Sequence, residues 1–366
     1  MAGKPKAQIT STAAFARHVG LARTTVSRVF NNQPGLRKET VERVRRAMEE
    51  VGFRPNPYAV MLLRGKTATI GMCVRYMDAP AVHTKTFALQ RELRARGFTV
   101  LIEMTKEDYA ETERIVRHFM LMRMEGIVFL GGFDPEHVRA STELLKPQGM
   151  PIVVGDQFEY TGLNTVILDR AKAMEELVVH LHGLGHRIFG LLGIRLNFLQ
   201  NDTRVRGVQM GLERCGLSFD SSVEMVPVTP TGSRSYDYGK TLAEAFLARH
   251  TRATAFLGLN DEVAVGAMWR FQEAGLRVPT DISITGFNNM EIAQHVTPAL
   301  TSVDQRVGDV MAAVADQIVL AIKKPAKRAR KEVLDAQLIL RGSIGPAQGA
   351  PAADEIAGSR DLAAGS

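Results

Sequence analysis

The 366-residue chain has few of the features that mark secreted or membrane proteins. Its only cysteines, Cys73 and Cys215, both lie in apolar-patterned segments, which indicates buried thiols in a reducing compartment rather than a disulfide framework. No apolar run approaches the roughly 18 residues that span a membrane. Residues 1–8 are polar and basic, and no apolar signal-peptide core follows them. We therefore expect a cytoplasmic protein that makes no membrane contact.

Motifs for catalysis and cofactor binding are also missing from the sequence. No Gly-x-Gly-x-x-Gly follows a predicted strand, and no Ser or Cys lies in a nucleophile-elbow pattern, so we expect neither a nucleotide cofactor nor an enzyme. His180, His182 and His186 resemble zinc ligands, but three histidines at one helix end are more typical of a solvated, partly packed cluster. No metal is expected.

The basic side chains are concentrated at one end of the sequence. Residues 1–68 contain 13 Lys and Arg against four acids, a net charge of +9, whereas the rest of the chain is close to neutral at −2. A small basic head on a near-neutral body is the charge distribution expected for nucleic-acid binding, although a solvated basic helix surface would give the same count. The length predicts two or three domains.

The basic head has the pattern of a helix-turn-helix. Ser11 can cap a first helix at 12–18, Gly20 provides a tight turn, and a second helix follows at 23–30. A third helix at 38–51 ends at Gly52 and packs its apolar face behind the second. The second helix would enter the major groove with its N-terminus first, where Arg23 can bond guanine and Thr24 can contact a base.

Several runs in this head are similar to those of the lactose/galactose repressor (LacI-type) family of bacterial transcriptional regulators. They are residues 16–31 (ARHVGLARTTVSRVFN), of which TVSRV at 25–29 is the most diagnostic, and GFRPN at 52–56. The chain departs from the family pattern at two helix caps, which are Ala22 and Arg37 here. The resemblance assigns DNA contacts to Arg23, Thr24, Thr25, Ser27, Arg28, Asn31, Asn56, Ala59 and Leu62.

The same resemblance describes the segment 55–68 as a hinge that folds into paired helices on DNA. By the family spacing, Leu62 would wedge into the minor groove at the centre of the site, and Ala59 would lie at the helix–helix contact. The alternative is that residues 61–63 belong to an ordinary interdomain core. Val60 replaces the family's arginine, which puts one backbone contact in doubt.

The body, from residue 69, alternates short apolar strands with amphipathic helices. Strands are expected at 70–74, 99–102, 126–130, 152–154, 166–168, 188–193, 223–226, 255–259 and 282–286. Helices are expected between them at 87–96, 110–122, 135–145, 171–184, 204–215, 236–249 and 262–274. Repeated strand–helix–strand units predict parallel sheets covered on both faces, and hence an α/β fold after the all-α head.

The resemblance extends through the body, at 181–188 (LHGLGHRI), 259–267 (LNDEVAVGA), 278–287 (VPTDISITGF) and 340–343 (LRGS). It implies a two-lobed periplasmic-binding-protein-like domain at 69–344. The chain would cross between lobes near Thr165, Val296 and Lys327, giving one lobe at 69–164 and 296–326 and the other at 165–295 and 327–344. The basic run 323–331 would then be a connection between lobes, and residues 345–366, rich in Ala, Gly and Pro, would be a disordered tail.

A ligand would bind between the lobes, at the carboxyl ends of the strands. The resemblance places effector contacts at Asp156, Arg204, Asn260, Asn288 and Gln305, and more loosely at Arg75, Phe198, Gln200 and Arg234. Asn288 replaces a family Asp and Arg234 an aromatic residue, so the expected site is more electropositive than one for a neutral sugar. Arg204 is the expected anchor, and an anionic sugar derivative the expected ligand. The alternative is that Arg75 or Arg234 pairs with Asp156 or points into solvent.

These expectations together describe a transcriptional regulator, a repressor, that binds a pseudo-palindromic operator as a homodimer and responds to a small carbohydrate-like effector. A solute-binding protein of the periplasmic type is the second interpretation; the basic head counts against it. An α/β enzyme is the third interpretation, but the sequence shows no set of residues in a known catalytic pattern.

Overall fold

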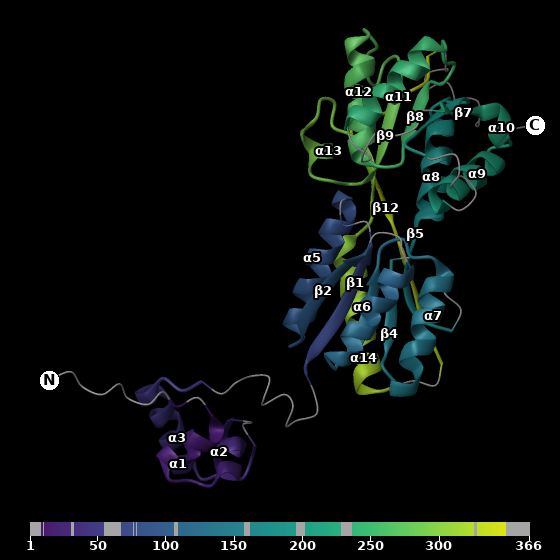
Figure 1. Cartoon of the computed structure of the whole chain (residues 1–366). Coiled ribbons are helices and arrows are strands. Elements are labelled where there is room, and N and C mark those ends of the chain that lie inside the picture. The colour runs from purple at the N-terminus through teal and green to yellow at the C-terminus, as the bar shows by residue number, and fades with distance from the viewer. Residues whose placement is uncertain are drawn as a thin grey trace, which may run out of the picture.

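The computed structural model describes residues 9, 11–30, 33–54, 67–75, 77, 79–105, 109–156, 162–194, 202–227, 236–325 and 328–348. They form a small helical head and a body of two α/β lobes (Figure 1). The predicted fold class, a helix-turn-helix head followed by a two-lobed parallel α/β domain, is confirmed.

The head consists of helices α1 (Thr12–Val19), α2 (Arg23–Phe30) and α3 (Lys38–Val51). The Ser11 side chain caps α1 by accepting a hydrogen bond from the Ala14 amide at 3.1 Å. Gly20 ends α1 in the left-handed conformation (φ 68°), which turns the chain into α2. Arg37 precedes α3 without a side-chain cap, as its departure from the family pattern predicts.

The head has its own apolar core, centred on Phe15. This ring is fully buried, stacks on Phe53 at 4.5 Å between centroids and tilts against Phe30 at 5.8 Å. Val26 and Val29 of α2 and Val44 of α3 are buried in the same cluster. Because the buried face of α2 is held by this core, its opposite face is directed to solvent.

The first lobe is built on a six-stranded parallel sheet in the order β11-β5-β4-β3-β1-β2. Helices α5 and α14 pack on one face of this sheet and α6 and α7 on the other. The strands are β1 (Thr69–Arg75), β2 (Thr99–Thr105), β3 (Gly126–Leu130), β4 (Ile152–Gly155), β5 (Asn164–Asp169) and β11 (Lys331–Asp335). The helices are α5 (Pro80–Ala95), α6 (Tyr109–Leu121), α7 (Pro135–Leu145), the short 3-10 helix Lys146–Gln148 and α14 (Val307–Lys323).

The second lobe repeats this plan with the order β12-β10-β9-β8-β6-β7, in which β12 is antiparallel to β10. Helices α8 and α9 pack on one face and α11 and α12 on the other. The strands are β6 (Phe189–Leu192), β7 (Val223–Glu224), β8 (Ala255–Gly258), β9 (Ser283–Asn288), β10 (Thr301–Asp304) and β12 (Gln337–Ile339). The helices are α8 (Arg170–Gly183), α9 (Thr203–Arg214), α10 (Phe219–Ser222), α11 (Tyr236–Ala248), α12 (Asp261–Glu273) and α13 (Ile292–His295).

The chain crosses between the lobes later than the sequence predicts. Strand β5 still belongs to the first sheet, so the first crossing follows Asp169 rather than Thr165. Strand β10 belongs to the second sheet, so the next crossing lies between Asp304 and α14 rather than at Val296. The last lies between β11 and β12. The basic run 323–331 therefore joins α14 to β11 within one lobe, which corrects the expected crossing at Lys327.

Among the helices of the described residues, none has both the length and the apolar character that crossing a bilayer requires. The predicted hinge at 55–68 and the predicted tail at 345–366 fall mostly outside those residues. Residues 345–348 are described, and they are bound to the second lobe: the Ala347 amide donates to the Leu184 carbonyl at 2.8 Å.

Candidate DNA-reading surface and interlobe site

The leading end of α2 presents Arg23 and Thr24 to solvent, as the sequence predicts. Arg28, one turn further on, is also exposed, and its Nη2 donates to the Pro34 carbonyl at 3.2 Å. Thr25 and Ser27 are half-buried on the flanks of the helix. The exposed face therefore carries two arginines and a threonine, side chains that bond base edges and phosphates.

The remaining predicted DNA contacts, Asn31, Asn56, Ala59 and Leu62, lie outside the described residues. The described basic side chains around α2 reinforce the charge of the reading face. Arg43 of α3 donates to the Val19 carbonyl and so ties α3 to the turn that sets the angle of α2. The surface can therefore attract a polyanion and present a rigid α2 to it.

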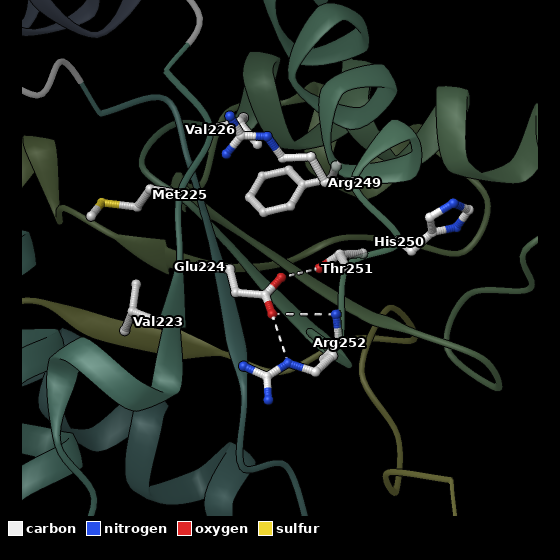
Figure 2. Close-up of a pocket in the computed structure, with 9 residues that line it drawn as sticks. Val223, Glu224, Met225, Val226, Arg249, His250, Thr251 and Arg252 are labelled. Carbon is white, nitrogen blue, oxygen red and sulfur yellow. Dashed lines mark hydrogen bonds and ion pairs between the residues drawn. The ribbon is translucent and has the colours of Figure 1, made fainter.

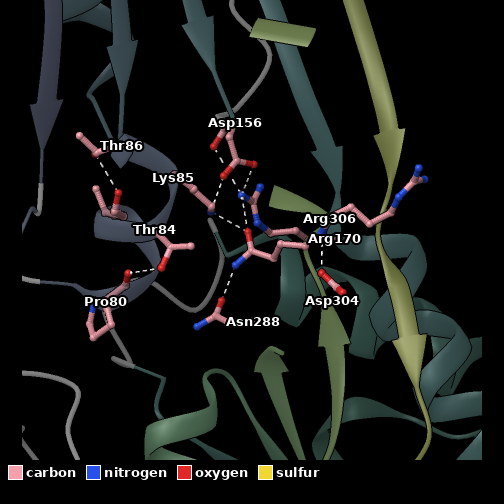
Figure 3. Close-up of polar contacts among 11 residues, drawn as sticks. Pro80, Thr84, Lys85, Thr86, Asp156, Arg170, Asn288, Asp304 and Arg306 are labelled. Atoms are coloured by element: carbon pink, nitrogen blue, oxygen red, sulfur yellow. Dashed lines mark hydrogen bonds and ion pairs between the residues drawn. The ribbon is translucent and has the colours of Figure 1, made fainter. Parts of the chain in front are cut away.

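Five polar side chains meet where the two lobes adjoin, and we call them the interlobe site: Lys85, Asp156, Arg170, Asn288 and Gln305 (Figure 3). Asp156 follows β4 and binds Lys85 of α5 through one oxygen and Arg170 of α8 through the other. The Lys85 Nζ also donates to Gln305 Oε1 at 2.6 Å, and the Gln305 amide donates to Asn288 at the end of β9. The network thus joins elements of both lobes.

Burial controls the charges of the interlobe site. The Lys85 side chain is 10% exposed and that of Asp156 is 3% exposed. Burial lowers the pKa of the Lys85 ammonium, attraction to Asp156 opposes this, and the nearby Arg170 lowers the pKa further. Burial alone would raise the pKa of Asp156, but Arg170 and Lys85 together hold it below its usual range. Asp156 is therefore ionised at neutral pH.

Arg204, the expected anchor, is engaged within the second lobe. Its guanidinium forms a fork with Asp202, with Nε–Oδ1 at 2.9 Å and Nη2–Oδ2 at 2.5 Å. Its third nitrogen donates to the Leu259 carbonyl, and the group lies 5.5 Å from the centre of the Phe287 ring. The fork and the carbonyl bond leave Arg204 neutralised by its own neighbour.

The other predicted effector residues have varied surroundings. Asn260 is buried next to Arg204's carbonyl partner and caps α12, accepting from the Val263 amide at 2.8 Å. Arg75, at the end of β1, donates to the Gly132 carbonyl within the first lobe. Phe198, Gln200 and Arg234 lie outside the described residues. The structure therefore brings together Asp156, Asn288 and Gln305 of the predicted set.

Lys85 and Arg170 were missed by the sequence reasoning. The predicted helices began at 87 and 171, so both residues fell just outside them, whereas α5 begins at Pro80 and α8 at Arg170. One signal was available, because Lys85 continues the buried stripe of Leu89 and Leu93 at a spacing of four residues. A lysine in line with a core stripe indicates a buried, paired charge.

A second buried carboxylate lies behind this region, at the start of α12. Asp261 is fully buried and accepts hydrogen bonds from the Ser302 hydroxyl and the Met290 amide, both at 2.6 Å. It therefore ties α12 to the segments that follow β9 and precede the crossing into α14. Burial raises its pKa from 3.8 to about 7, against the effect of those two bonds.

This shift predicts a pH-dependent stability. Since the folded-state pKa of Asp261 lies above its unfolded value, the contribution of this group is present below pH 3.8 and is lost as pH rises through about 7. We expect Asp261→Asn, relative to the parent, to gain about 1–3 kcal/mol of unfolding free energy between pH 5 and pH 8. Urea denaturation followed by Trp269 fluorescence measures this, since Trp269 lies on the same helix. The exposed Asp220→Asn is the control, and parallel pH profiles for Asp261→Asn and the parent would contradict the assignment.

A separate depression of about 400 Å³ lies at the outer edge of the second lobe, between β7 and the turn that leads into β8 (Figure 2). Glu224 is bound there by the Thr251 hydroxyl at 2.5 Å and by the Arg252 side chain at 3.5 Å. This turn precedes β8, so the depression is at the amino end of the strand, away from the interlobe site. Its acid is already paired with its neighbours.

A basic helix-turn-helix head and a two-lobed body with a polar site between its lobes define the class of DNA-binding transcription regulators with a ligand-binding domain. Comparison with models of known protein families agrees with this class. Residues 15–56 match the model of bacterial regulatory proteins of the lacI family, and residues 178–344 match that of a periplasmic binding protein-like domain. The chain therefore combines a lacI-family helix-turn-helix domain with a periplasmic binding protein-like domain.

Known proteins of similar length match this chain over most of its sequence. Catabolite control protein A of Priestia megaterium is 26% identical over 88% of this chain and 94% of its own length. The HTH-type transcriptional regulator DegA of Bacillus subtilis is 26% identical over 90% of this chain and 97% of its own length. A Lac repressor structure bound to ONPG in the repressed state is 25% identical, covers 93% of this chain and 100% of that one, and has a TM-score of 0.79.

Proposed function

We propose that this protein is a sequence-specific transcriptional regulator, a repressor, that binds a pseudo-palindromic operator as a homodimer in the cytoplasm. The observation that carries the proposal is the leading end of α2, where Arg23 and Thr24 are exposed while Val26 and Val29 fix the helix on the head's core. The net charge of +9 on residues 1–68 supplies the non-specific attraction to DNA. The relatives named above, a catabolite control protein and an HTH-type transcriptional regulator, support the proposal.

Dimerisation is supported by exposed apolar side chains on the first lobe. They belong to α5, the edge strand β2, the two ends of α6 and the residue that follows it: Phe87, Met104, Tyr109, Leu121 and Met122. Large apolar side chains that are exposed at a sheet edge and on the helices beside it can be covered by a second copy of the chain. A two-fold dimer would pair two heads on two half-sites, since one helix-turn-helix reads a half-site alone.

We assign one proposed function to each of the domains expected from the sequence. Residues 1–54 read DNA, 55–68 form the hinge with Asn56, Ala59 and Leu62 as contacts, and 69–344 bind the effector and dimerise. The proposed effector is a small carbohydrate-like molecule at the interlobe site, contacted by Asp156, Asn288 and Gln305. The second lobe would add Arg204 and Asn260. Arg75, Phe198, Gln200 and Arg234 remain looser assignments from the family resemblance.

Replacing Arg23 tests the reading helix. Operator sequences are first selected from random DNA with the full-length protein. We then expect Arg23→Ala to lose about 1–3 kcal/mol of operator affinity and to relax the preference at one base pair of each half-site. The lost bidentate contact to a base is the reason. Gel shifts and a repeated selection measure both effects.

Lys38→Ala is the matched control, because Lys38 is an exposed cation at the start of α3, away from the reading end of α2. It should weaken binding to all DNA by a similar factor and leave the selected consensus unchanged. If Arg23→Ala selects the same consensus and binds it with the affinity of the parent, Arg23 does not contact a base and the proposed orientation of α2 in the groove is wrong. Failure of the parent protein to select any sequence would favour a solute-binding protein instead.

A further inference from the structure

The interlobe site carries more positive than negative charge. Among the residues that the structure describes, Lys85 and Arg170 share a single carboxylate, that of Asp156, and all three side chains are largely buried, at 10%, 17% and 3% exposure. Arg204 adds no free charge because Asp202 neutralises it, but it lies close enough to Lys85 to repel its ammonium. An excess of one buried positive charge is costly unless something compensates it.

Both cations have more hydrogen-bond donors than their bonds to Asp156 and Gln305 use. Lys85 Nζ has three hydrogens and donates to Asp156 and Gln305. Arg170 binds Asp156 and Gln305 through Nη2 alone. Within the described part of the chain, its Nε and Nη1 form no hydrogen bond. An anionic oxygen could therefore be bound by both residues without breaking the existing bonds.

The placement of Arg170 has no explanation in helix stability. It is the first residue of α8, where the positive end of the helix dipole disfavours a cation. It directly follows Asp169, the last residue of β5, at the first crossing between the lobes. Gln305, its other partner, lies at the second crossing, between β10 and α14. A ligand bound here would contact two of the three connections between the lobes.

We propose that the effector carries an anionic group, a carboxylate or a phosphate, whose oxygens bind Lys85 Nζ and the Arg170 guanidinium beside Asp156. The anion balances the excess charge, and Asn288 and Gln305 lie within the same network to bind hydroxyls of the remainder. The anchor is thus Lys85 with Arg170, in place of the Arg204 expected from the sequence. Binding couples to lobe position because Lys85 belongs to the first lobe and Arg170 to the second. The inference rests on the proposed function in placing the effector at this site.

Small anions test the site without knowledge of the natural ligand. Thermal unfolding of the full-length protein is followed by circular dichroism in sodium acetate, sodium phosphate and sodium chloride at matched ionic strength. We expect acetate or phosphate to stabilise the parent more than chloride does, and the anion that does so identifies the carboxylate or phosphate class. We expect Lys85→Met and Arg170→Met each to weaken the apparent affinity for that anion at least about tenfold.

Lys172→Met is the matched control, because Lys172 is an exposed cation on the same helix, paired with Asp335 at 2.9 Å. It should keep the anion response of the parent. Lys85→Gln and Arg170→Gln serve if a methionine variant does not fold. The proposal is overturned if neither acetate nor phosphate stabilises the parent more than chloride does. It is also overturned if the variants of both Lys85 and Arg170 keep the same extra stabilisation as the parent.

Operator binding separates this inference from the proposed function. Gel shifts with selected operator DNA are repeated with glucose, glucuronate and glucose 6-phosphate. Lys172→Met should bind operator as the parent does, since Lys172 is exposed and lies outside the interlobe site. One outcome contradicts the anionic ligand alone: the parent binds operator, shows no preference for acetate or phosphate over chloride, and is released from DNA only by glucose. The proposed function as a regulator would then still hold. A parent that shows the anion response but binds no DNA would instead remove the proposed function.

Discussion

Phe15→Ala is expected to abolish operator binding while the body remains folded. The Phe15 ring is fully buried, and the head's core is small, with Phe53 and Phe30 packed against that one side chain. Removing a buried phenylalanine costs about 3–5 kcal/mol, which is comparable with the whole stability of a domain of this size. Gel shifts measure the loss. Fluorescence of Trp269, the single tryptophan of the chain, reports the body alone.

Phe15→Leu is the control for that experiment, because leucine keeps most of the buried apolar volume. It should retain folding of the head and most of the operator affinity. Operator binding by Phe15→Ala at the level of the parent would mean that α1, α2 and α3 hold together without this core. A fall in the denaturation midpoint of Trp269 would mean that head and body do not fold independently.

Asp156→Ala is expected to destabilise the body strongly. The substitution leaves Lys85 and Arg170 buried side by side without their carboxylate, and breaking such a pair costs about 3–5 kcal/mol. Lys85→Met should cost far less, because Asp156 keeps Arg170 as its partner. Urea denaturation followed by circular dichroism gives both values.

The double variant Lys85→Met/Asp156→Ala separates charge from packing. It should recover more than half of the loss, because only Arg170, which is 17% exposed, then lacks a partner. If the double variant is as unstable as Asp156→Ala, the loss of unfolding free energy comes from packing around the Asp156 backbone, which has a positive φ of 56°. A loss in Asp156→Ala below about 1 kcal/mol would show that the cations do not depend on this carboxylate.

The helices of the head could be predicted closely because each signal is local. The Ser11 cap, the Gly20 turn and the apolar spacing of α2 act over a few residues, and the structure has α2 and α3 at the predicted bounds. The longer elements of the body were also predicted, within a few residues at most ends. The α5 start was the exception, because Pro80 lies seven residues before the predicted first residue, 87.

Other elements were not predicted from the sequence. Strands β10, β11 and β12 and helix α14 are missing from the expected set, and the crossings between the lobes were displaced with them. Strand β11 is exposed along much of its length and pairs with β5, more than 160 residues earlier. A short polar strand without alternation has no periodic signal, since its pairing comes from a distant partner.

The sequence by itself determined the class of this protein. The basic charge of residues 1–68, the helix-turn-helix spacing and the alternation of strands and helices are properties of neighbouring residues, and they suffice for a DNA-reading head on an α/β body. Only the tertiary structure decided how the charges are paired. Arg204 is neutralised by Asp202 two residues away, whereas Lys85 and Arg170 converge on Asp156 from different lobes. The pairing of buried charges depends on distances between elements remote in the chain, and these distances exist only once the lobes are assembled.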